Sequence, residues 1–514
     1  MAWTLYSLGF VATIVALAGW FYFYKDEGLS KVFRIALFSA LGLYFISFPL
    51  NLGPVDLKLP ILIRDLVVMA VFGWTLQVLS QKRTWMPAGL AVLSLGLFGY
   101  YNLALTSSFQ INESEQLSVR DFSDLDPNAE LLIEVSETSS VQSLQSIADQ
   151  YNLQLDRAFF PKDVDFTDLD DYYIVNIPDA QLKNFDQIVT ALQNSGHLDW
   201  LEENELVQIH PLEAQPLSTI NKKFGINDPG LAQMWGFEAM NVDQLYDLLR
   251  EQNIKPQKVA KIAILDTGVD AQHEDIKANF TSTQSKYDAD KRGHGTHCAG
   301  IAGAVSNNGK GIASYAPNNS FVRLTSVKVL SDAGMGSQQG IINGMIEAAD
   351  SGADVLSMSL GGRSNQSRQR AYKKAVDYVT KKGGIVVAAA GNSRMNAKDY
   401  SPVNTPGVIG VAAIDQNLKL ASFSNYVSDI KMGLAAPGVG IYSSIPNSKY
   451  GSYNGTSMAC PYVAGLIGMM KAIEPELTAK KAHKILKATG KSLDDGARAG
   501  KLIQPAEAIR RLLK

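Results

Sequence analysis

Three short segments of the sequence carry the residue types that can activate a serine for attack on a carbonyl group. Asp266 ends a short aliphatic run, His294 lies between two glycines, and Ser457 follows a Gly-Thr pair. A serine hydroxyl is a weak nucleophile at neutral pH, so it needs a base that takes its proton and a group that orients this base. Taken alone, Ser457 is equally well interpreted as the N-cap of a helix.

Each of these residues stands at the end of a predicted element. Residues 261–266 form a buried strand with a carboxylate at its C-terminal end. His294 lies at the entrance of a helix of small residues, and Ser457 lies at or next to the start of another helix. Gly455 allows the tight turn before that helix. A helix N-terminus leaves N–H groups unpaired, so one of them can stabilise an oxyanion next to Ser457.

Three motifs in this order resemble one enzyme family. They are DTG at 266–268, HGTH at 294–297 and NGTSMA at 454–459, and Asp, His, Ser is the chain order of the subtilisin triad. The sequence is therefore similar to the subtilisin-like serine proteases, the subtilases, from about Asn227 to the C-terminus. After Val259, short apolar runs alternate with helical stretches, which favours an α/β fold with a doubly wound parallel sheet.

The resemblance implies a role for each residue of the site in the hydrolysis of polypeptide substrates. Ser457 would attack the peptide carbonyl, His294 would take and return the proton, and Asp266 would orient the imidazole. His297 competes as a base, but the first histidine of HGTH is the family's catalytic one. A strand that ends in Asn392 is similar to the family's oxyanion-hole segment, so we expect a buried side-chain amide there.

The resemblance also implies where the substrate and a cation bind. Two extended segments would hold the polypeptide by backbone pairing, which gives affinity with little sequence preference. One structural Ca²⁺ site is expected, because hard oxygen ligands suit that ion; no catalytic cofactor and no nucleic-acid partner is expected. The substrate-binding residues would be Gly334, Met335, Gly336, Ser359, Leu360 and Gly361, and the calcium ligands would be Asp228, Asp275 and Asn308.

The first 107 residues differ in composition from the rest of the 514-residue chain. They hold four apolar segments near the length that crosses a bilayer, 3–24, 32–50, 61–79 and 87–106. Four such segments in succession predict permanent anchors in the lipid bilayer rather than a cleavable signal peptide. The Lys and Arg residues of the connecting loops put the catalytic part on the non-cytoplasmic side, provided that the third segment spans.

The region between the membrane segments and the catalytic part is strongly acidic. Residues 111–214 hold 22 Asp and Glu against 4 Lys and Arg, whereas residues 215–514 hold 24 against 36. Opposite net charges on neighbouring regions favour mutual binding, and a solvated acidic spacer is the alternative.

The pattern of this acidic region predicts a small α+β domain. Strands are expected at 130–135, 172–177 and 206–209, and helices at 141–151 and 182–192. The series is similar to the inhibitor-type propeptide of subtilases, a ferredoxin-like domain. Such a module would lay its tail, around 210–218, across the active site as the chain's own inhibitor. Cleavage there would release the catalytic domain, or the domains would stay joined on the membrane.

We therefore divide the chain into consecutive regions. These are a transmembrane region at 1–107, a linker at 108–128, the propeptide-type domain at 129–212, a linker or processing region at 213–226 and the catalytic domain at 227–514. The chain has two cysteines, Cys298 and Cys460, which are too few for a disulfide framework. We interpret them as buried thiols, and a disulfide bond between them is the alternative.

Two other functions remain as alternatives. A catalytically silent subtilase fold would act as a binding module, but it would have no need of an intact quartet of Asp266, His294, Asn392 and Ser457. An intramembrane protease using Arg64 and Asp65 would lack a second carboxylate, or a serine and histidine pair, at bilayer depth.

Overall fold

The computed structural model describes most of the chain after residue 121 and part of the chain before it. The described residues are 5–50, 65–66, 68–69, 71–73, 75–77, 122–209, 212–214, 223–317, 319–364 and 370–514. They belong to two compact units, Met1–Val119 and Arg120–Lys514.

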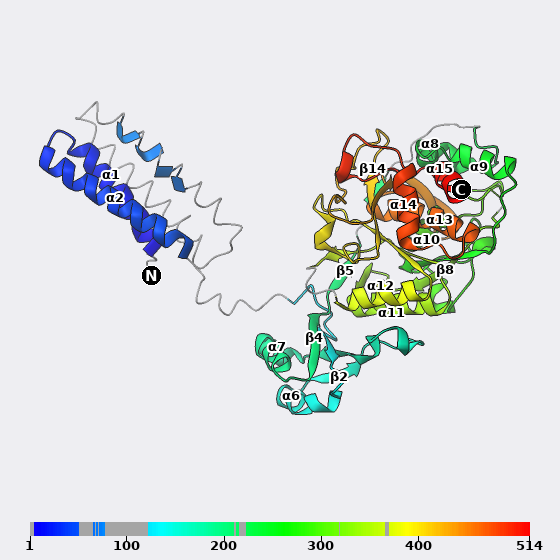
Figure 1. The fold of residues 1–514 in the computed structure, drawn as a ribbon, viewed down its shortest axis with the longest axis horizontal. Helices are drawn as coiled ribbons and strands as arrows, with labels where there is room; N and C mark the ends of the chain where they lie inside the picture. Colours follow the sequence, from blue (N-terminus) through cyan, green and yellow to red (C-terminus); the bar gives the residue numbers. More distant parts are fainter. Residues whose placement is uncertain are drawn as a thin grey trace. The chain divides into compact units, whose positions relative to one another are not determined.

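The first unit contains two apolar helices that lie side by side, α1 (Leu5–Tyr22) and α2 (Glu27–Leu50) (Figure 1). A short turn joins them, and Asp26 ends this turn as the N-cap of α2, because its carboxylate accepts the N–H of Leu29 at 3.0 Å. The first two predicted membrane segments are therefore helical.

One stretch of α2, Glu27–Phe45, is long and apolar enough to cross a bilayer, and it is the only such helix among the described residues. Helical residues also occur between 65 and 77, within the predicted third segment. There the Tyr44 hydroxyl donates to the buried carboxylate of Asp65 at 3.2 Å. The predicted fourth segment, 87–106, lies outside the described residues.

A six-stranded parallel sheet forms the centre of the second unit, in the order β15-β14-β12-β10-β7-β8. Five of its strands match the apolar runs of the sequence, and β15 is an additional one. The strands are β7 (Ala260–Asp266), β8 (Val322–Lys328), β10 (Val355–Met358), β12 (Ile385–Ala389), β14 (Ile409–Ile414) and β15 (Gly433–Pro437). The prediction of an α/β fold with a parallel sheet is confirmed.

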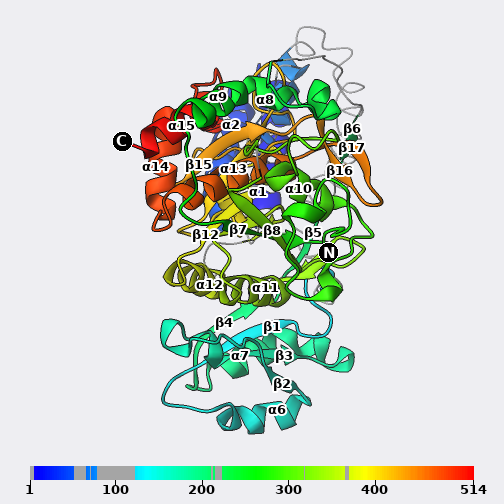
Figure 2. The ribbon, with the colours of Figure 1, turned by 90° about the vertical axis from the view of Figure 1, so that its right-hand side faces the viewer.

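Helices cover both faces of this sheet because its strands are apolar on both sides (Figure 2). In β7, Ile262 and Ile264 join the apolar cluster that includes α10 and α13, whereas Ala263 and Leu265 join the cluster that includes α11 and α12. Further helices, α9, α14 and α15, add to the first cluster. Their bounds are α9 (Val242–Glu251), α10 (His294–Gly303), α11 (Gln338–Asp350), α12 (Arg370–Lys381), α13 (Thr456–Ile473), α14 (Ala479–Thr489) and α15 (Pro505–Leu512).

The topology of the sheet favours a ligand-binding site at the C-terminal ends of β7 and β10. Its strand order reverses at β7, which lies between β8 and β10, and ligands of such sheets bind at the C-terminal ends of the strands near this point. Asp266 is the last residue of β7, and Ser359 directly follows β10. α13 reaches this point because Gly465 lets it approach α10: a Cβ at Gly465 would lie 2.6 Å from the Ala302 carbonyl oxygen.

The acidic region before the catalytic part folds into an antiparallel sheet with two helices. The strand order β2-β3-β1-β4 and the chain order β-α-β-β-α-β are those of a ferredoxin-like module. The elements are β1 (Leu131–Val135), α6 (Gln145–Tyr151), β2 (Gln154–Arg157), β3 (Tyr172–Asn176), α7 (Phe185–Gln193) and β4 (Leu198–Glu203). This arrangement is no solvated spacer.

Two strands of this module differ from the sequence expectation. β2 was not predicted, and residues 206–209, predicted as the last strand of the module, do not join its sheet, in which β4 pairs with β1. Residues Leu206–Gln208 form β5, which pairs with β9 (Met335–Ser337) of the catalytic part. The hydrophobic pattern of the sequence did not predict β4, because the buried carboxylate of Glu202 interrupts the apolar face of this strand.

The module rests on α11 and α12, which lie between it and the six-stranded sheet (Figure 2). Leu131 and Ile133 face the module's own helices, whereas Leu132 joins the cluster of α11 and α12. The contact carries charge pairs of the expected sign: Glu134 lies 3.0 Å from Lys374 and 3.2 Å from Arg370.

Candidate active site

The end of β7 places Asp266 against the first residue of α10. The Nδ1 atom of His294 lies 2.8 and 2.9 Å from the two carboxylate oxygens of Asp266, and both side chains are fully buried. A carboxylate accepts hydrogen bonds, so Nδ1 carries the proton and Nε2 is left with its lone pair. Nε2 of His294 has no hydrogen-bond partner among the described residues. The imidazole is therefore oriented as a general base.

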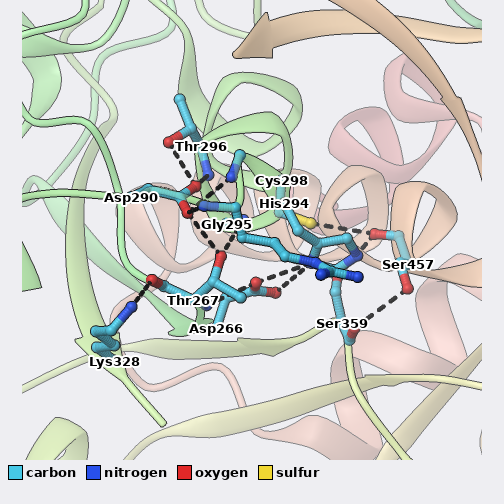
Figure 3. Close-up of polar contacts among 12 residues, drawn as sticks. Asp266, Thr267, Asp290, His294, Gly295, Thr296, Cys298, Lys328, Ser359 and Ser457 are labelled. Carbon is cyan, nitrogen blue, oxygen red and sulfur yellow. Dashed lines mark hydrogen bonds and ion pairs between the residues drawn. The ribbon is translucent and has the colours of Figure 1, made fainter. Parts of the chain in front are cut away.

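Ser457 is the second residue of α13 and lies beside this pair (Figure 3). Gly455 precedes the helix with φ 155° and ψ 157°, a conformation that is essentially restricted to glycine. The Ser457 hydroxyl donates to the Ser359 carbonyl at 3.1 Å, so the serine–imidazole hydrogen bond is not formed. The Ser457 carbonyl accepts from the Ser359 hydroxyl at 2.7 Å, which fixes the backbone. Rotation of the Ser457 side chain is the change that would direct its hydroxyl to His294.

Asn392 lies in the loop after β12 and faces the start of α13. Its side-chain oxygen accepts from the N–H and from the hydroxyl of Thr456, both at 2.9 Å. The amide NH₂ of Asn392 therefore points away from Thr456, and a Cβ at Gly455 would lie 3.4 Å from it. The prediction of a buried amide was wrong: Asn392 is exposed, because it lies three residues beyond the end of β12.

The segment that carries these four residues matches known proteins. The subtilase family model matches residues 257–501. Thermitase from Thermoactinomyces vulgaris is 42% identical over 250 residues, which are 48% of this chain and 84% of thermitase. The chain belongs to the subtilase family.

Two further relatives extend the comparison of this subtilase. Subtilisin DY from Bacillus licheniformis is 39% identical over 269 residues, 51% of this chain and 94% of that protein. Alkaline elastase YaB from Bacillus sp. (strain YaB) is 31% identical over 395 residues, 74% of this chain and 97% of that protein. This subtilase is a serine endopeptidase, and its substrates are polypeptides.

A carboxylate that the sequence analysis missed holds the start of α10 in this subtilase. One oxygen of Asp290 accepts from the N–H and the hydroxyl of Thr296, at 2.9 and 2.8 Å. The other accepts from the Thr267 hydroxyl at 2.9 Å and the Gly293 N–H at 2.8 Å. Asp290 thus ties the end of β7 to the first turn of the helix that carries His294. An acidic residue just before a helix start is the signal in the sequence, because it satisfies unpaired N–H groups.

The second histidine of HGTH has a structural role. Burial lowers the pKa of His297 to about 3, so the ring is neutral. Its Nε2 lies 3.0 Å from the Ile441 carbonyl and 3.1 Å from the Gly451 carbonyl, so this nitrogen is the donor. The ring stacks on Tyr453 with centroids 4.4 Å apart. His297 therefore binds neighbouring backbone and is not directed at Ser457.

Both cysteines are free and buried. Burial raises the pKa of the Cys298 thiol well above its usual range and that of Cys460 to about 12, so both thiols stay protonated. The Cys298 thiol donates to the Ser457 carbonyl at 3.4 Å. Neither cysteine has the thiolate character of a nucleophile.

The expected substrate-binding residues adjoin either the segment that follows the module or Ser457. Gly334 accepts the N–H of Ile209 at 3.0 Å, and Met335 and Gly336 belong to the strand that pairs with β5. Ser359 bonds to Ser457, as described above. The two residues after it are tightly packed: Leu360 is buried in the cluster of α11 and α12, and a Cβ at Gly361 would lie 2.8 Å from the Ser401 carbonyl oxygen.

The expected calcium ligands lie together in loops away from Asp266, His294 and Ser457. Asp228 accepts the N–H of Asn307 at 2.6 Å and that of Asn308 at 3.1 Å. Asp275 accepts the side-chain amide of Asn308 at 2.8 Å and the N–H of Ile312 at 2.7 Å. Burial raises the pKa of Asp228, and it raises that of Asp275 to about 7. Two buried carboxylates with no ion pair to a Lys or Arg in the described structure are chemically suited to a hard cation.

Proposed function

We propose that this subtilase is a membrane-anchored endopeptidase in which Asp266, His294 and Ser457 form the catalytic triad. The observation that carries the proposal is the contact of His294 Nδ1 with both oxygens of Asp266 at 2.8 and 2.9 Å. This contact sets the tautomer, and it leaves Nε2 of His294 beside Ser457 as a base with no hydrogen-bond partner among the described residues.

The catalytic cycle then follows from the positions of these atoms. The Ser457 hydroxyl turns from Ser359 to His294 and attacks the substrate carbonyl carbon while Nε2 takes its proton. Asp266 stabilises the imidazolium, which next gives the proton to the leaving amine. Water hydrolyses the acyl-enzyme ester by the same proton transfers in reverse. The Asn392 amide and the Ser457 N–H, near the start of α13, donate to the oxyanion.

A substitution of Ser457 by alanine tests this mechanism. Ser457→Ala abolishes both hydrolysis of a peptide substrate and labelling by a fluorophosphonate, a reagent that reacts with activated serines. Ser326→Ala is the matched control, because Ser326 is also buried and its hydroxyl has no partner among the described residues. Labelling of Ser457→Ala at another serine would contradict the assignment.

We further propose that the module at 129–212 is an inhibitory propeptide and that the chain is made as a zymogen. β5 takes the place of a substrate strand along β9, which supports this role. The match to alkaline elastase YaB also supports it, because 74% of the chain is more than the catalytic part, 227–514, contains.

Removal of one buried side chain of the tail tests the inhibition. Val207 is 3% exposed, so Val207→Asp would bury a charge at this position. We expect β5 to dissociate from β9 for this reason, and peptide hydrolysis by the full chain should rise. Val164→Asp is the control in the same module, because Val164 is 48% exposed. If both variants and the parent hydrolyse the peptide equally fast, this tail does not inhibit the enzyme.

The remaining proposals concern the membrane and the cation. The apolar N-terminal region would anchor the chain, with the catalytic part on the non-cytoplasmic side, and Asp228, Asp275 and Asn308 would hold a structural Ca²⁺. Lys514→Cys tests the orientation, because Lys514 is exposed and the native cysteines are buried. A membrane-impermeant maleimide labels this variant in intact cells if the catalytic part lies outside. Labelling only after cell lysis would reverse the orientation.

A further inference from the structure

A proline inside α13 leaves the carbonyl group of Ser457 without its helical hydrogen-bond donor. In an α-helix, the carbonyl of each residue accepts the N–H of the residue four positions later. For Ser457 that residue is Pro461, which lies inside the helix and has no N–H. The ring of a proline also crowds the carbonyl four residues before it. The carbonyl of Ser457 is therefore not held by the hydrogen bonds of its own helix.

Two side chains from other elements donate to this carbonyl instead (Figure 3). The Ser359 hydroxyl donates to it at 2.7 Å, and the Cys298 thiol donates to it at 3.4 Å. All three residues are buried, and a buried carbonyl without a partner is unfavourable. The two donors thus replace the missing helical one. The hydroxyl is the stronger of the two, because a thiol is a weak donor.

These donors connect Ser457 to the elements that carry the rest of the site. Cys298 lies one helical turn after His294 on α10. Ser359 directly follows β10, which pairs with β7, the strand that ends in Asp266. A helical N–H at position 461 would connect Ser457 only to α13 itself. The bonds to α10 and to the end of β10 instead fix the backbone of Ser457 relative to the base and to the carboxylate that orients it.

Ser359 and Ser457 are bonded to each other in both directions. The Ser457 hydroxyl donates to the Ser359 carbonyl at 3.1 Å, and the Ser359 hydroxyl donates to the Ser457 carbonyl. When the Ser457 side chain turns to His294, the first bond breaks, but the second bond does not depend on that rotation. The Ser359 hydroxyl therefore holds the backbone of Ser457 throughout. The Ser457 oxygen and N–H, which both take part in the proposed reaction, belong to this backbone position.

We propose that the Ser359 hydroxyl is a positioning group for the nucleophile, and that it is needed because Pro461 removes the N–H that would otherwise hold the Ser457 carbonyl. The proposal rests on Ser457 as the nucleophile, as given under the proposed function. It adds to the expected role of Ser359 in substrate binding, because that role uses the backbone of residue 359, whereas positioning uses its side chain.

The proposal predicts that the Ser359 hydroxyl matters only while residue 461 is proline. In the full-length chain, Ser359→Ala should lower both kcat for peptide hydrolysis and the rate of fluorophosphonate labelling about tenfold, with KM changed less. Pro461→Ala supplies an N–H for the Ser457 carbonyl. In this Pro461→Ala background, Ser359→Ala should therefore lower the same two rates by no more than about twofold.

Ser357→Ala is the matched control for both backgrounds. Ser357 is also buried and lies two residues earlier on β10, but its hydroxyl contacts the Cys460 thiol at 3.9 Å and not Ser457. Ser357→Ala should keep the kcat and the labelling rate of the chain into which it is introduced. A tenfold loss in Ser357→Ala as well would overturn the proposal, because any buried hydroxyl of β10 would then have the same effect.

The remaining outcomes separate this proposal from the proposed function. Equal rates in Ser359→Ala and the parent overturn the positioning role, and so does a tenfold loss that is the same in the Pro461→Ala background. If Ser359→Ala does not fold, the double variant Ser359→Ala with Pro461→Ala should fold and hydrolyse the peptide, and its failure to fold overturns the proposal. All these results leave the proposed function standing if Ser457→Ala loses hydrolysis and labelling. If Ser457→Ala keeps them, the proposed function fails and the proposal fails with it.

Discussion

The Thr456 hydroxyl donates to the Asn392 side-chain oxygen at 2.9 Å while it accepts the N–H of Gly391 at 3.0 Å. Thr456 thereby fixes the orientation of the Asn392 amide. The amide oxygen is engaged by two donors of Thr456, so the NH₂ group is the end that is free to stabilise an oxyanion.

Replacement of Thr456 by valine should therefore loosen Asn392 without moving the triad. Thr456→Val keeps the backbone N–H but loses the hydroxyl, and we expect kcat to fall about tenfold, equivalent to about 1.4 kcal/mol, with KM changed less. Thr456→Ser restores the hydroxyl and should restore kcat. Asn392→Ala should cost about 10²–10³-fold in kcat, the usual loss for one oxyanion donor. Steady-state kinetics on one peptide substrate measures all three, and a Thr456→Ser variant as slow as Thr456→Val would contradict the account.

Asp290 should affect catalysis through the position of His294. Both carboxylate oxygens of Asp290 accept hydrogen bonds, whereas the amide of Asp290→Asn has only one acceptor oxygen. Some N–H and hydroxyl groups at the start of α10 therefore lose their partner. We expect the free energy of unfolding to fall by about 1–3 kcal/mol. We also expect kcat to fall about tenfold while KM is kept, because Asp290 is buried and acts through the start of α10.

Denaturant unfolding and steady-state kinetics measure these two effects of Asp290→Asn. Asp288→Asn is the control, because Asp288 is close in sequence and none of its side-chain atoms bonds to α10 in the described structure. A loss of stability with unchanged kcat would assign Asp290 a purely structural role.

The short motifs were sufficient to predict the proposed catalytic residues because each of these residues stands at the end of a local pattern. Asp266 ends an aliphatic run, and glycines mark the turns before His294 and Ser457. These signals come from the chain itself, since strand burial and helix starts depend on nearby residues. The parallel sheet follows from the same local runs.

The features that sequence reasoning missed depend on contacts between distant segments. The positioning role of Asp290 depends on its hydrogen bond with Thr267, a residue of a separate segment. The exposure of Asn392 depends on where the loop after β12 turns. β5 has the alternation of a module strand, but its partner is β9, more than a hundred residues away. In β4, Glu202 is buried because it meets the start of α12, which no pattern within β4 reveals.

This buried carboxylate makes docking of the module dependent on pH. Glu202 is 2% exposed and accepts the N–H groups of Arg370 and Ala371 at 3.1 and 3.2 Å. Burial nevertheless raises the pKa of Glu202 to about 7. The docked state therefore binds a proton more tightly than the undocked state, in which the carboxyl has a pKa of about 4.3. Docking should weaken as the pH rises from about 4.3 to about 7, by up to about 4 kcal/mol.

Hydrogen exchange of the Ser457→Ala chain measures this pH dependence. After correction for intrinsic exchange, β4 should be better protected at pH 5.5 than at pH 8.5. Glu202→Gln should remove most of the difference, because its side chain does not ionise. Glu203→Gln, on the neighbouring residue of the same strand, should keep it. A slope of opposite sign in the Ser457→Ala chain would show that the hydrogen bonds to Glu202 outweigh its burial.

The buried pair of Asp228 and Asp275 should make the stability of the catalytic domain dependent on calcium. A cation between the two carboxylates offsets their mutual repulsion, so chelation with EDTA should lower Tm, and excess Ca²⁺ should restore it. Free calcium at about a hundred times Kd adds about 2.7 kcal/mol, an increase in Tm of about 5 °C. Asp275→Asn keeps the acceptor for the Ile312 N–H but removes a charge, so its Tm should respond little to Ca²⁺. The exposed Asp429→Asn variant should respond as the parent does. An equal response to Ca²⁺ in Asp275→Asn and the parent, measured by calorimetry, would place the cation elsewhere.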